Sequence, residues 1–184
     1  DKMKRMAADN KLAVFSAFVI LFFLLLAVCA PLLTPYSFED QDLLSRLSAP
    51  SAKHLLGTDE LGRDVLTRLL YGARVSLAVG IIPTIASMVI GVLLGMISGY
   101  VGGIVDAVIM RLADVVLSFP SLLLAMVIMY TLGDGITSIF IALAITSWAG
   151  VARVIRSETL TLRETEYVEA ARSMGVKDFT IILR

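Results

Sequence analysis

The chain has 184 residues, of which 58% are hydrophobic and 17% charged, and its mean hydropathy is +0.87. This composition is too apolar for an ordinary water-soluble domain and indicates a membrane protein. The net charge is zero, so no excess of basic residues suggests a nucleic acid partner. One cysteine and one histidine exclude a disulfide within the chain and any metal site that needs paired cysteines or paired histidines.

Four stretches carry no charged residue: 12–38, 75–105, 115–133 and 135–152. A hydrocarbon core of about 30 Å needs roughly 20 helical residues to cross it. In lipid every backbone polar group needs an internal partner, so each spanning stretch must be helical. The pattern therefore predicts an all-α membrane protein with transmembrane helices at about 12–33, 75–99, 108–132 and 136–156.

The first predicted helix has an alternative interpretation as a secretory signal, because basic residues precede it in segment 1–11. Its apolar run is 22 residues long, however, which exceeds the roughly 7–15 residues of a signal core. A lipoprotein cleavage site before Cys29 would need a small residue at position 28, where the chain has Val28. We therefore expect a transmembrane helix.

Basic residues favour an orientation with the N-terminus in the cytoplasm. In that orientation the inner segments hold eleven lysines and arginines and the outer segments hold five, and inner loops are enriched in these residues. We accordingly expect a cytoplasmic N-terminus at 1–11, an extracytoplasmic loop at 34–74 and a membrane domain at 75–184. The last part of that domain, 157–184, should return to the cytoplasm.

The predicted outer loop contains several polar residues with candidate roles. Thr58 or Asp59 can cap an amphipathic helix that starts at about residue 60. Asp59, Glu60 and Asp64 lack the alternating oxygen ligands of a calcium loop. We expect these carboxylates to be solvated, and His54 to be an ordinary loop residue.

Small residues recur every four positions in the second predicted helix, at Ser87, Gly91, Gly95 and Gly99. They share one face, where a neighbouring helix can approach closely. Pro83 in this helix and Pro120 in the next are expected to bend them. Arg111 and Asp114 are three residues apart, which predicts an ion pair along one helical face.

The sequence lacks the residues of a membrane enzyme. It has no serine and histidine together within a span, because His54 lies in the predicted outer loop. It has no GxxxxGK(S/T) phosphate loop, so we expect ATP to be bound elsewhere.

The polar stretch EYVEAARSMGVKDF follows the last predicted span. Residues 157–174 contain strong helix formers and no helix breakers. Val168, Ala171 and Gly175, with Tyr167 and Met174 beside them, form a narrow face with little side-chain bulk. Gly175 permits a turn before a second short amphipathic piece. This arrangement suggests a plug for a groove in a partner protein.

EAARSMG resembles the first half of the EAA loop found in permease subunits of bacterial ABC importers. The matching residues are Glu169, Ala170, Ala171 and Gly175. The stretches HLLGTDELGRDVLTRLLYGARVSLAVG and GVLLGMISGYVGGIVDAVIMRLADVVLSFPSLLLA resemble the oligopeptide/dipeptide/nickel branch. Within it they are similar to the second permease of the pair, whose outer GTD…GRD motif is matched by Gly57, Thr58, Asp59, Gly62, Arg63 and Asp64. The resemblance covers most of residues 12–184.

The resemblance implies a polytopic helical bundle of the type I ABC importer permease kind, similar to the methionine importer permease. Such permeases have six transmembrane helices, of which four are expected within these 184 residues, so the chain alone should not transport. The implied partners are a homologous permease, two cytoplasmic ATPases that bind ATP and magnesium, an extracytoplasmic substrate-binding protein and the lipid of a bacterial inner membrane. No cofactor is implied in this chain. The implied ATPase-coupling residues are Tyr167, Glu169, Ala170, Ala171 and Gly175.

Other functions stay open on the sequence. The branch includes both peptide and nickel permeases, and we favour peptides as the commoner substrate class. A permease of another ABC importer branch is an alternative, although the GTD…GRD motif argues against it. A second alternative is a non-transport membrane scaffold that anchors a cytoplasmic partner through 157–184.

Overall fold

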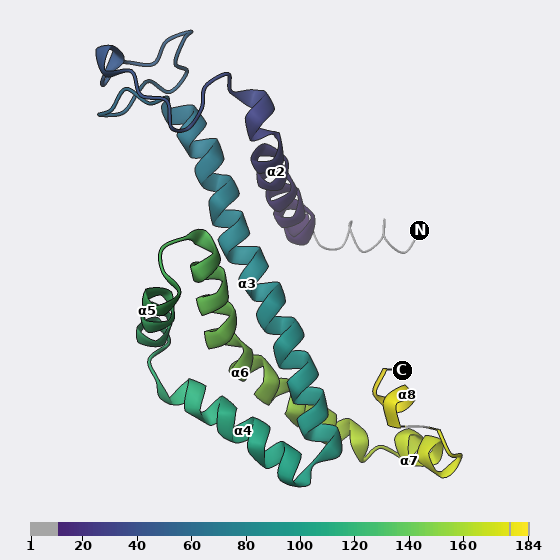
Figure 1. The fold of residues 1–184 in the computed structure, drawn as a ribbon. Coiled ribbons are helices and arrows are strands. Elements are labelled where there is room, and N and C mark those ends of the chain that lie inside the picture. Colours follow the sequence, from purple (N-terminus) through teal and green to yellow (C-terminus); the bar gives the residue numbers. More distant parts are fainter. Residues whose placement is uncertain (1–10, 177, 184) are drawn as a thin grey trace. The chain divides into compact units, whose positions relative to one another are not determined.

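The computed structural model describes residues 11–176 and 178–183 (Figure 1). The predicted cytoplasmic N-terminus therefore lies, apart from Lys11, outside the described residues. These residues form helices and no strand, which confirms the predicted all-α class. In chain order the elements are α2 (Lys11–Leu33), the 3-10 turn η1 (Leu43–Ser45), α3 (Val65–Val101), α4 (Gly103–Ser118), α5 (Ser121–Leu132), α6 (Ile136–Arg163), α7 (Glu166–Ser173) and α8 (Asp178–Leu183). The chain divides into two compact units, 1–78 and 79–184.

Among the described residues, three helices, α2, α3 and α6, are long and apolar enough to cross a membrane. The pair α4 and α5 passes the same test together, although its two axes differ by 95°. Within α2 most of the large side chains are exposed, with Phe15 at 66% and Leu32 at 88%. Exposed apolar side chains of this kind are expected on a helix that faces lipid.

The third predicted span, 108–132, differs from the structure because two helices replace one (Figure 1). Pro120 disfavours helical backbone in the residue before it, and Phe119 is extended with φ −93° and ψ 142°. α5 then begins at Ser121, and the Pro120 carbonyl accepts a hydrogen bond from the Leu124 amide at 3.0 Å. With 12 residues α5 is about 18 Å long. It is thus shorter than the roughly 30 Å that a complete span needs.

Other boundaries also differ from those predicted. α3 begins at Val65 rather than at about 75, and it continues through Pro83 to Val101. No separate amphipathic helix starts near residue 60, because Gly62 has a φ of +74° and ends the preceding turn. α6 extends seven residues beyond the predicted end at 156. The helix is therefore longer than its charge-free part.

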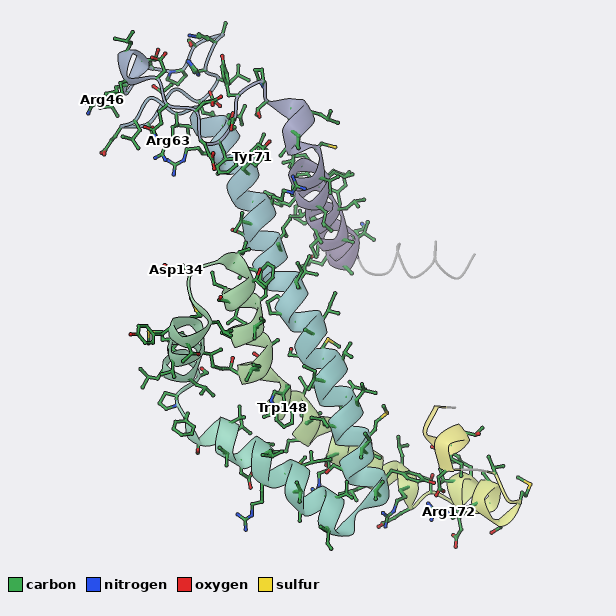
Figure 2. The ribbon with its side chains drawn as sticks, in the orientation of Figure 1. Arg46, Arg63, Tyr71, Asp134, Trp148 and Arg172 are labelled. Atoms are coloured by element: carbon green, nitrogen blue, oxygen red, sulfur yellow. The ribbon has the colours of Figure 1, made fainter. Side chains whose placement is uncertain are left out.

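The core of the second unit lies around Trp148 of α6 (Figure 2). Ala113 of α4 and two alanines of α6, Ala149 and Ala152, are fully buried beside it. Leu94 of α3 and Met110 and Val116 of α4 pack against this cluster. Small residues thus bring α3, α4 and α6 together around one large aromatic ring.

Candidate functional site

The stripe of small residues in α3 lies against α6. A Cβ atom would lie 2.8 Å from the Trp148 carbonyl oxygen at Gly91 and 2.6 Å from that of Ala152 at Gly95. At Gly99 it would lie 2.8 Å from the carbonyl oxygen of Arg156. Real side chains essentially never approach backbone atoms this closely, so only glycine permits this helix spacing. Ser87, the fourth member of the stripe, is buried and donates to the Thr84 carbonyl at 2.9 Å.

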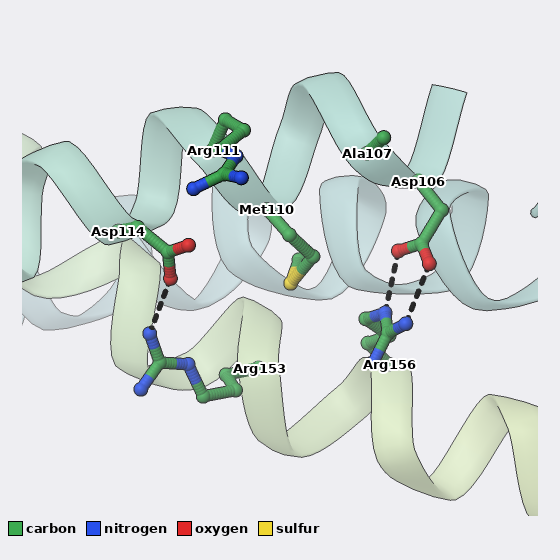
Figure 3. Close-up of a pocket in the computed structure, with 7 residues that line it drawn as sticks. All are labelled: Asp106, Ala107, Met110, Arg111, Asp114, Arg153 and Arg156. Carbon is green, nitrogen blue, oxygen red and sulfur yellow. Dashed lines mark hydrogen bonds and ion pairs between the residues drawn. The ribbon is translucent and has the colours of Figure 1, made fainter. Parts of the chain in front are cut away.

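Two ion pairs join α4 to α6 beside this stripe (Figure 3). Asp106 binds Arg156 through two contacts of 2.5 Å and also accepts from the Ser98 hydroxyl. Asp114 binds Arg153 at 2.8 Å. The predicted pair of Arg111 with Asp114 is therefore wrong, because the Asp114 side chain pairs across to α6. Together these charged residues line a pocket of about 380 Å³ with Ala107 and Met110.

The Gly57–Asp64 motif, which is the GTD…GRD sequence, forms a tight loop in the first unit. Gly57 and Gly62 have φ angles of +75° and +74°, a region that favours glycine. A Cβ atom at Gly62 would also overlap the carbonyl oxygen of Asp42, and one at Gly57 would overlap that of Ser48. Both glycines are therefore required by conformation and by space.

Thr58 holds this motif against residues 45–48, and Asp59 binds two arginines of the same unit. The buried Thr58 hydroxyl donates to the Ser45 carbonyl and accepts from the Ser48 amide at 2.9 Å. Asp59 accepts from the Arg63 guanidinium at 2.9 Å and from Arg68 at 2.5 Å. Partial burial raises the pKa of Asp59, but hydrogen bonds from these arginines and from backbone amides outweigh it and leave the pKa well below its usual range. Asp59 is thus a structural carboxylate and not a freely solvated one.

Asp64 caps α3, whereas the sequence had suggested Thr58 or Asp59 as the cap of a separate helix from about residue 60. Its Oδ2 accepts from both the amide and the hydroxyl of Thr67 at 2.8 Å, which satisfies a free amide of the first helical turn. Its Oδ1 lies 3.0 Å from His54 Nδ1, and both side chains are less than 10% exposed. Burial raises the pKa of Asp64, but the hydrogen bonds from Thr67 and His54 leave it lowered. The expectation of a solvated Asp64 is therefore wrong.

His54 is a structural residue that sequence reasoning missed. Its ring stacks on Tyr36 with centroids 5.0 Å apart, and Asp64 holds its Nδ1. Its Nε2 is buried without a hydrogen-bond partner among the described residues. No local pattern signals this role, because ten residues separate His54 from Asp64 and eighteen separate it from Tyr36.

The predicted coupling residues lie on and just after α7. Gly175 has a φ of +81°, and two hydrogen bonds close the turn: Gly175 N to Arg172 O at 2.9 Å and Val176 N to Ala171 O at 3.2 Å. This pair of bonds is the Schellman arrangement that ends many helices at a glycine. Gly175 thus stops α7 cleanly before the chain continues toward α8.

One side of α7 is open and the other is covered. The exposed side presents Tyr167, which is 64% exposed, together with Glu169 and Ala170, while Ala171 is half-buried. Val168 is only 7% exposed and turns inward. The prediction of a narrow partner-binding face through Val168 is therefore wrong. Near the covered side, Arg172 contacts Tyr100 at the end of α3. Sequence reasoning missed this contact, because 72 residues separate the two.

Comparison with known protein families gives two matches. The family model described as binding-protein-dependent transport system inner membrane component matches residues 91–184, which is half of the chain and includes the three glycines of the α3 stripe, α4, α6 and α7. The chain belongs to this family. The model of the N-terminal transmembrane domain of oligopeptide transport permease C matches residues 5–50. Together these matches confirm the resemblance to the peptide branch and place this family member in the inner membrane.

Three relatives are similar along almost the whole chain. It is 43% identical over 178 residues to the dipeptide transport system permease protein DppC of Bacillus subtilis (strain 168), which covers 97% of this chain and 56% of the relative. The glutathione transport system permease protein GsiD of Pectobacterium atrosepticum is 41% identical, and the match covers 94% of this chain and 58% of the relative. The oligopeptide transport system permease protein OppC of Bacillus subtilis is 38% identical, and the match covers 96% of this chain and 58% of the relative. The chain thus spans somewhat more than half the length of these relatives.

Proposed function

We propose that this chain is part of a permease subunit of an ATP-driven importer and that α7 docks on a cytoplasmic ATPase. The observation that carries the proposal is the open side of α7, where Tyr167, Glu169 and Ala170 are exposed next to the glycine turn at Gly175. An eight-residue helix with one free face is suited to a groove in a partner. Family membership supports the same role.

In this proposal the membrane helices and the ATPases have separate roles. Each of two ATPases binds ATP and magnesium, and its movement displaces α7. A homologous permease pairs with this subunit, and the close-packed α3, α4 and α6 form part of the pathway between them. The 34–64 loop is rigid enough to face an extracytoplasmic substrate-binding protein, because its turns are held by the hydrogen bonds of Thr58, Asp59 and Asp64.

Peptides are the proposed cargo. The three relatives are named for dipeptide, glutathione and oligopeptide transport, and all three substrates consist of amino acids joined by amide bonds. Nickel, the other substrate class of the branch, is not named in these relatives. Uptake of a labelled dipeptide and of nickel into proteoliposomes that hold the complete importer would distinguish the two cargoes.

ATPase docking is tested by Ala170→Arg in the complete subunit, co-expressed with its permease partner and the ATPases. Ala170 is exposed, so the arginine fits the free chain and obstructs only a partner that packs against the methyl group. Ala171→Arg should act in the same direction, but its half-buried site also strains the subunit. Ala52→Arg, a matched change in the exposed part of the 34–64 loop, serves as the control.

We expect the wild type and Ala52→Arg to retain the ATPases in a membrane pull-down and Ala170→Arg to lose most of them. If Ala170→Arg retains the ATPases as the wild type does, α7 is not the docking element. If even the wild type retains no ATPase, the importer function itself fails and the scaffold alternative becomes the better explanation.

A further inference from the structure

Tyr100, the last residue but one of α3, connects three other helices of the second unit. Its side chain is almost completely buried, at 8% exposed. The hydroxyl lies 2.5 Å from Asp178 Oδ1 of α8 and 3.1 Å from Arg172 Nη2 of α7. It donates to the carboxylate and accepts from the guanidinium, so both of its hydrogen-bonding roles are used. Arg172 also lies over the ring, 5.4 Å from its centroid.

The backbone of Tyr100 is held as well. Its carbonyl oxygen is in the last turn of α3, where carbonyl groups have no partner within the helix. Arg163, the last residue of α6, donates to this oxygen at 2.9 Å. The end of α3 is therefore tied to α6 through the main chain and to α7 and α8 through the phenol group.

Two of the contacts are strengthened by charge. Arg172 and Asp178 carry opposite charges, and their side chains lie 3.9 Å apart beside the phenol group. Hydrogen bonds to ionised groups are stronger and more directional than those between neutral groups. Arg172 is on the same short helix as the open side of α7, so displacement of that helix must either move Tyr100 or break these bonds.

Displacement of Tyr100 would not be absorbed within α3. Gly99, the residue directly before it, lies against the backbone of α6, and Gly95 and Gly91 do the same about one and two turns earlier. A contact between two helix backbones has little space for local rearrangement, because protein interiors are close-packed. The helix therefore responds by shifting along or away from α6 as a unit, which is a recognised form of switching motion.

We propose that Tyr100 is the positioning residue through which the α7–α8 segment moves α3, and that its phenol hydroxyl couples ATP use to substrate passage. This inference rests on the proposed function. In this role Tyr100 contacts neither substrate nor ATP. The role differs from a purely structural one, because loss of the hydroxyl should leave ATP hydrolysis intact while substrate transport falls.

The test uses Tyr100→Phe in the complete importer, with both permeases, the ATPases and a peptide-loaded binding protein, in proteoliposomes. ATP hydrolysis and labelled peptide uptake are measured in the same vesicles. The variant keeps the ring and loses only the hydroxyl. Tyr130→Phe is the matched control, because Tyr130 is 89% exposed on α5 and its hydroxyl makes no hydrogen bond within the described part of the chain.

We expect Tyr100→Phe to retain its ATPases and to hydrolyse ATP, while peptide uptake per ATP falls roughly tenfold, a typical size for coupling between sites. Tyr130→Phe should keep the wild-type ratio. Asp178→Ala provides a second variant that should not compromise folding, since its side chain is 67% exposed, and the same ratio should fall there by a smaller factor.

An unchanged uptake-to-hydrolysis ratio in both Tyr100→Phe and Asp178→Ala would overturn the proposal. It would also be overturned if Tyr100→Phe lost its ATPases and Asp178→Ala kept a normal ratio, since Tyr100 would then be merely structural. Both results leave the proposed importer function standing, because that function fails only when the wild type itself binds no ATPase or takes up no substrate.

Discussion

The two glycines of the Gly57–Asp64 motif have φ angles of +75° and +74°, whereas the glycines of the α3 stripe are ordinary helical residues. In the motif, the backbone conformation already excludes most side chains before any neighbour is considered. In the stripe, every residue type can adopt the backbone angles, and the neighbouring α6 backbone is what excludes a side chain. Glycine thus sets chain direction in the first unit and helix spacing in the second.

The forces around these glycines differ in the same way. The motif is surrounded by hydrogen bonds and charges, including the arginine contacts of Asp59 and the buried pair of His54 and Asp64. The stripe lies against the α6 backbone and the side chains of Val151, Ile155 and Thr159, where dispersion between closely packed atoms provides the attraction. The first region should therefore respond to charge and pH, and the second mainly to volume.

Gly95→Leu should have the largest effect, because it places a bulky side chain where even a Cβ atom would lie 2.6 Å from the Ala152 carbonyl oxygen. Overpacking usually lowers the free energy of unfolding by about 1–3 kcal/mol. Because the obstacle here is backbone, which cannot move aside, we expect a loss of about 3 kcal/mol or more. The thermal stability of the complete subunit in detergent measures the loss.

Gly80→Leu is the matched control for that change. Gly80 lies in the same helix, yet a Cβ atom there meets nothing within 4 Å. We expect Gly80→Leu to be close to neutral, with a slight gain from better helix propensity. Equal losses for the two variants would show that helix spacing is not the reason for the stripe.

Gly62→Ala should have the next largest effect, since the alanine would be strained at φ +74° and would overlap the Asp42 carbonyl. Gly103→Ala separates the two causes, because Gly103 has a φ of +56° but open space around its Cβ position. We expect Gly103→Ala to destabilise the protein by about 1 kcal/mol, from strain alone, and Gly62→Ala to destabilise it by about 2–3 kcal/mol, from strain and overlap together. Hydrogen exchange within 57–67 and within 103–113 measures the two losses, and similar values would remove the steric part of the explanation.

The parts of the fold that follow from one stretch of chain were predictable from sequence. The charge-free runs indicate the spans, and the four-residue recurrence of small residues indicates the face of α3 on which α6 packs. Gly175 was likewise expected to permit the turn that it makes. Each of these inferences uses the periodicity or the composition of a single element.

The parts that depend on distant residues were not predictable. Arg111 and Asp114 looked like a pair from their spacing, but Asp114 prefers Arg153, 39 residues away, once α4 packs on α6. Asp64 and His54 are buried together only because the turn at Gly62 brings the chain back. The break at Pro120 was expected as a bend, and its size of 95° depends on how α4 and α5 each pack against α6.

Acidification should have the smallest effect, and it should act on the Gly57–Asp64 motif through the carboxylates of Asp59 and Asp64. A carboxyl whose pKa is lower in the folded state stabilises that state above its unfolded pKa, and the contribution disappears as the pH falls through the folded value. The pKa values of Asp64 and Asp59 are both lowered from the ordinary 3.8. Below about pH 4 the protection of the Thr67 amide should therefore decrease, as measured by hydrogen exchange corrected for intrinsic pH effects.

Asp64→Asn tests whether the charge of Asp64 causes this loss. Asparagine still offers an oxygen to the Thr67 amide, so the cap survives, but the charge-assisted bond with His54 is lost. We expect destabilisation of about 1 kcal/mol at pH 7, from the difference between charged and neutral hydrogen bonds, and a flatter pH profile. The profile should not become flat altogether, because Asp59 contributes in the same direction. An unchanged profile in Asp64→Asn would assign the acid sensitivity to Asp59 and its arginines, and the buried pair with His54 would then act through shape rather than through charge.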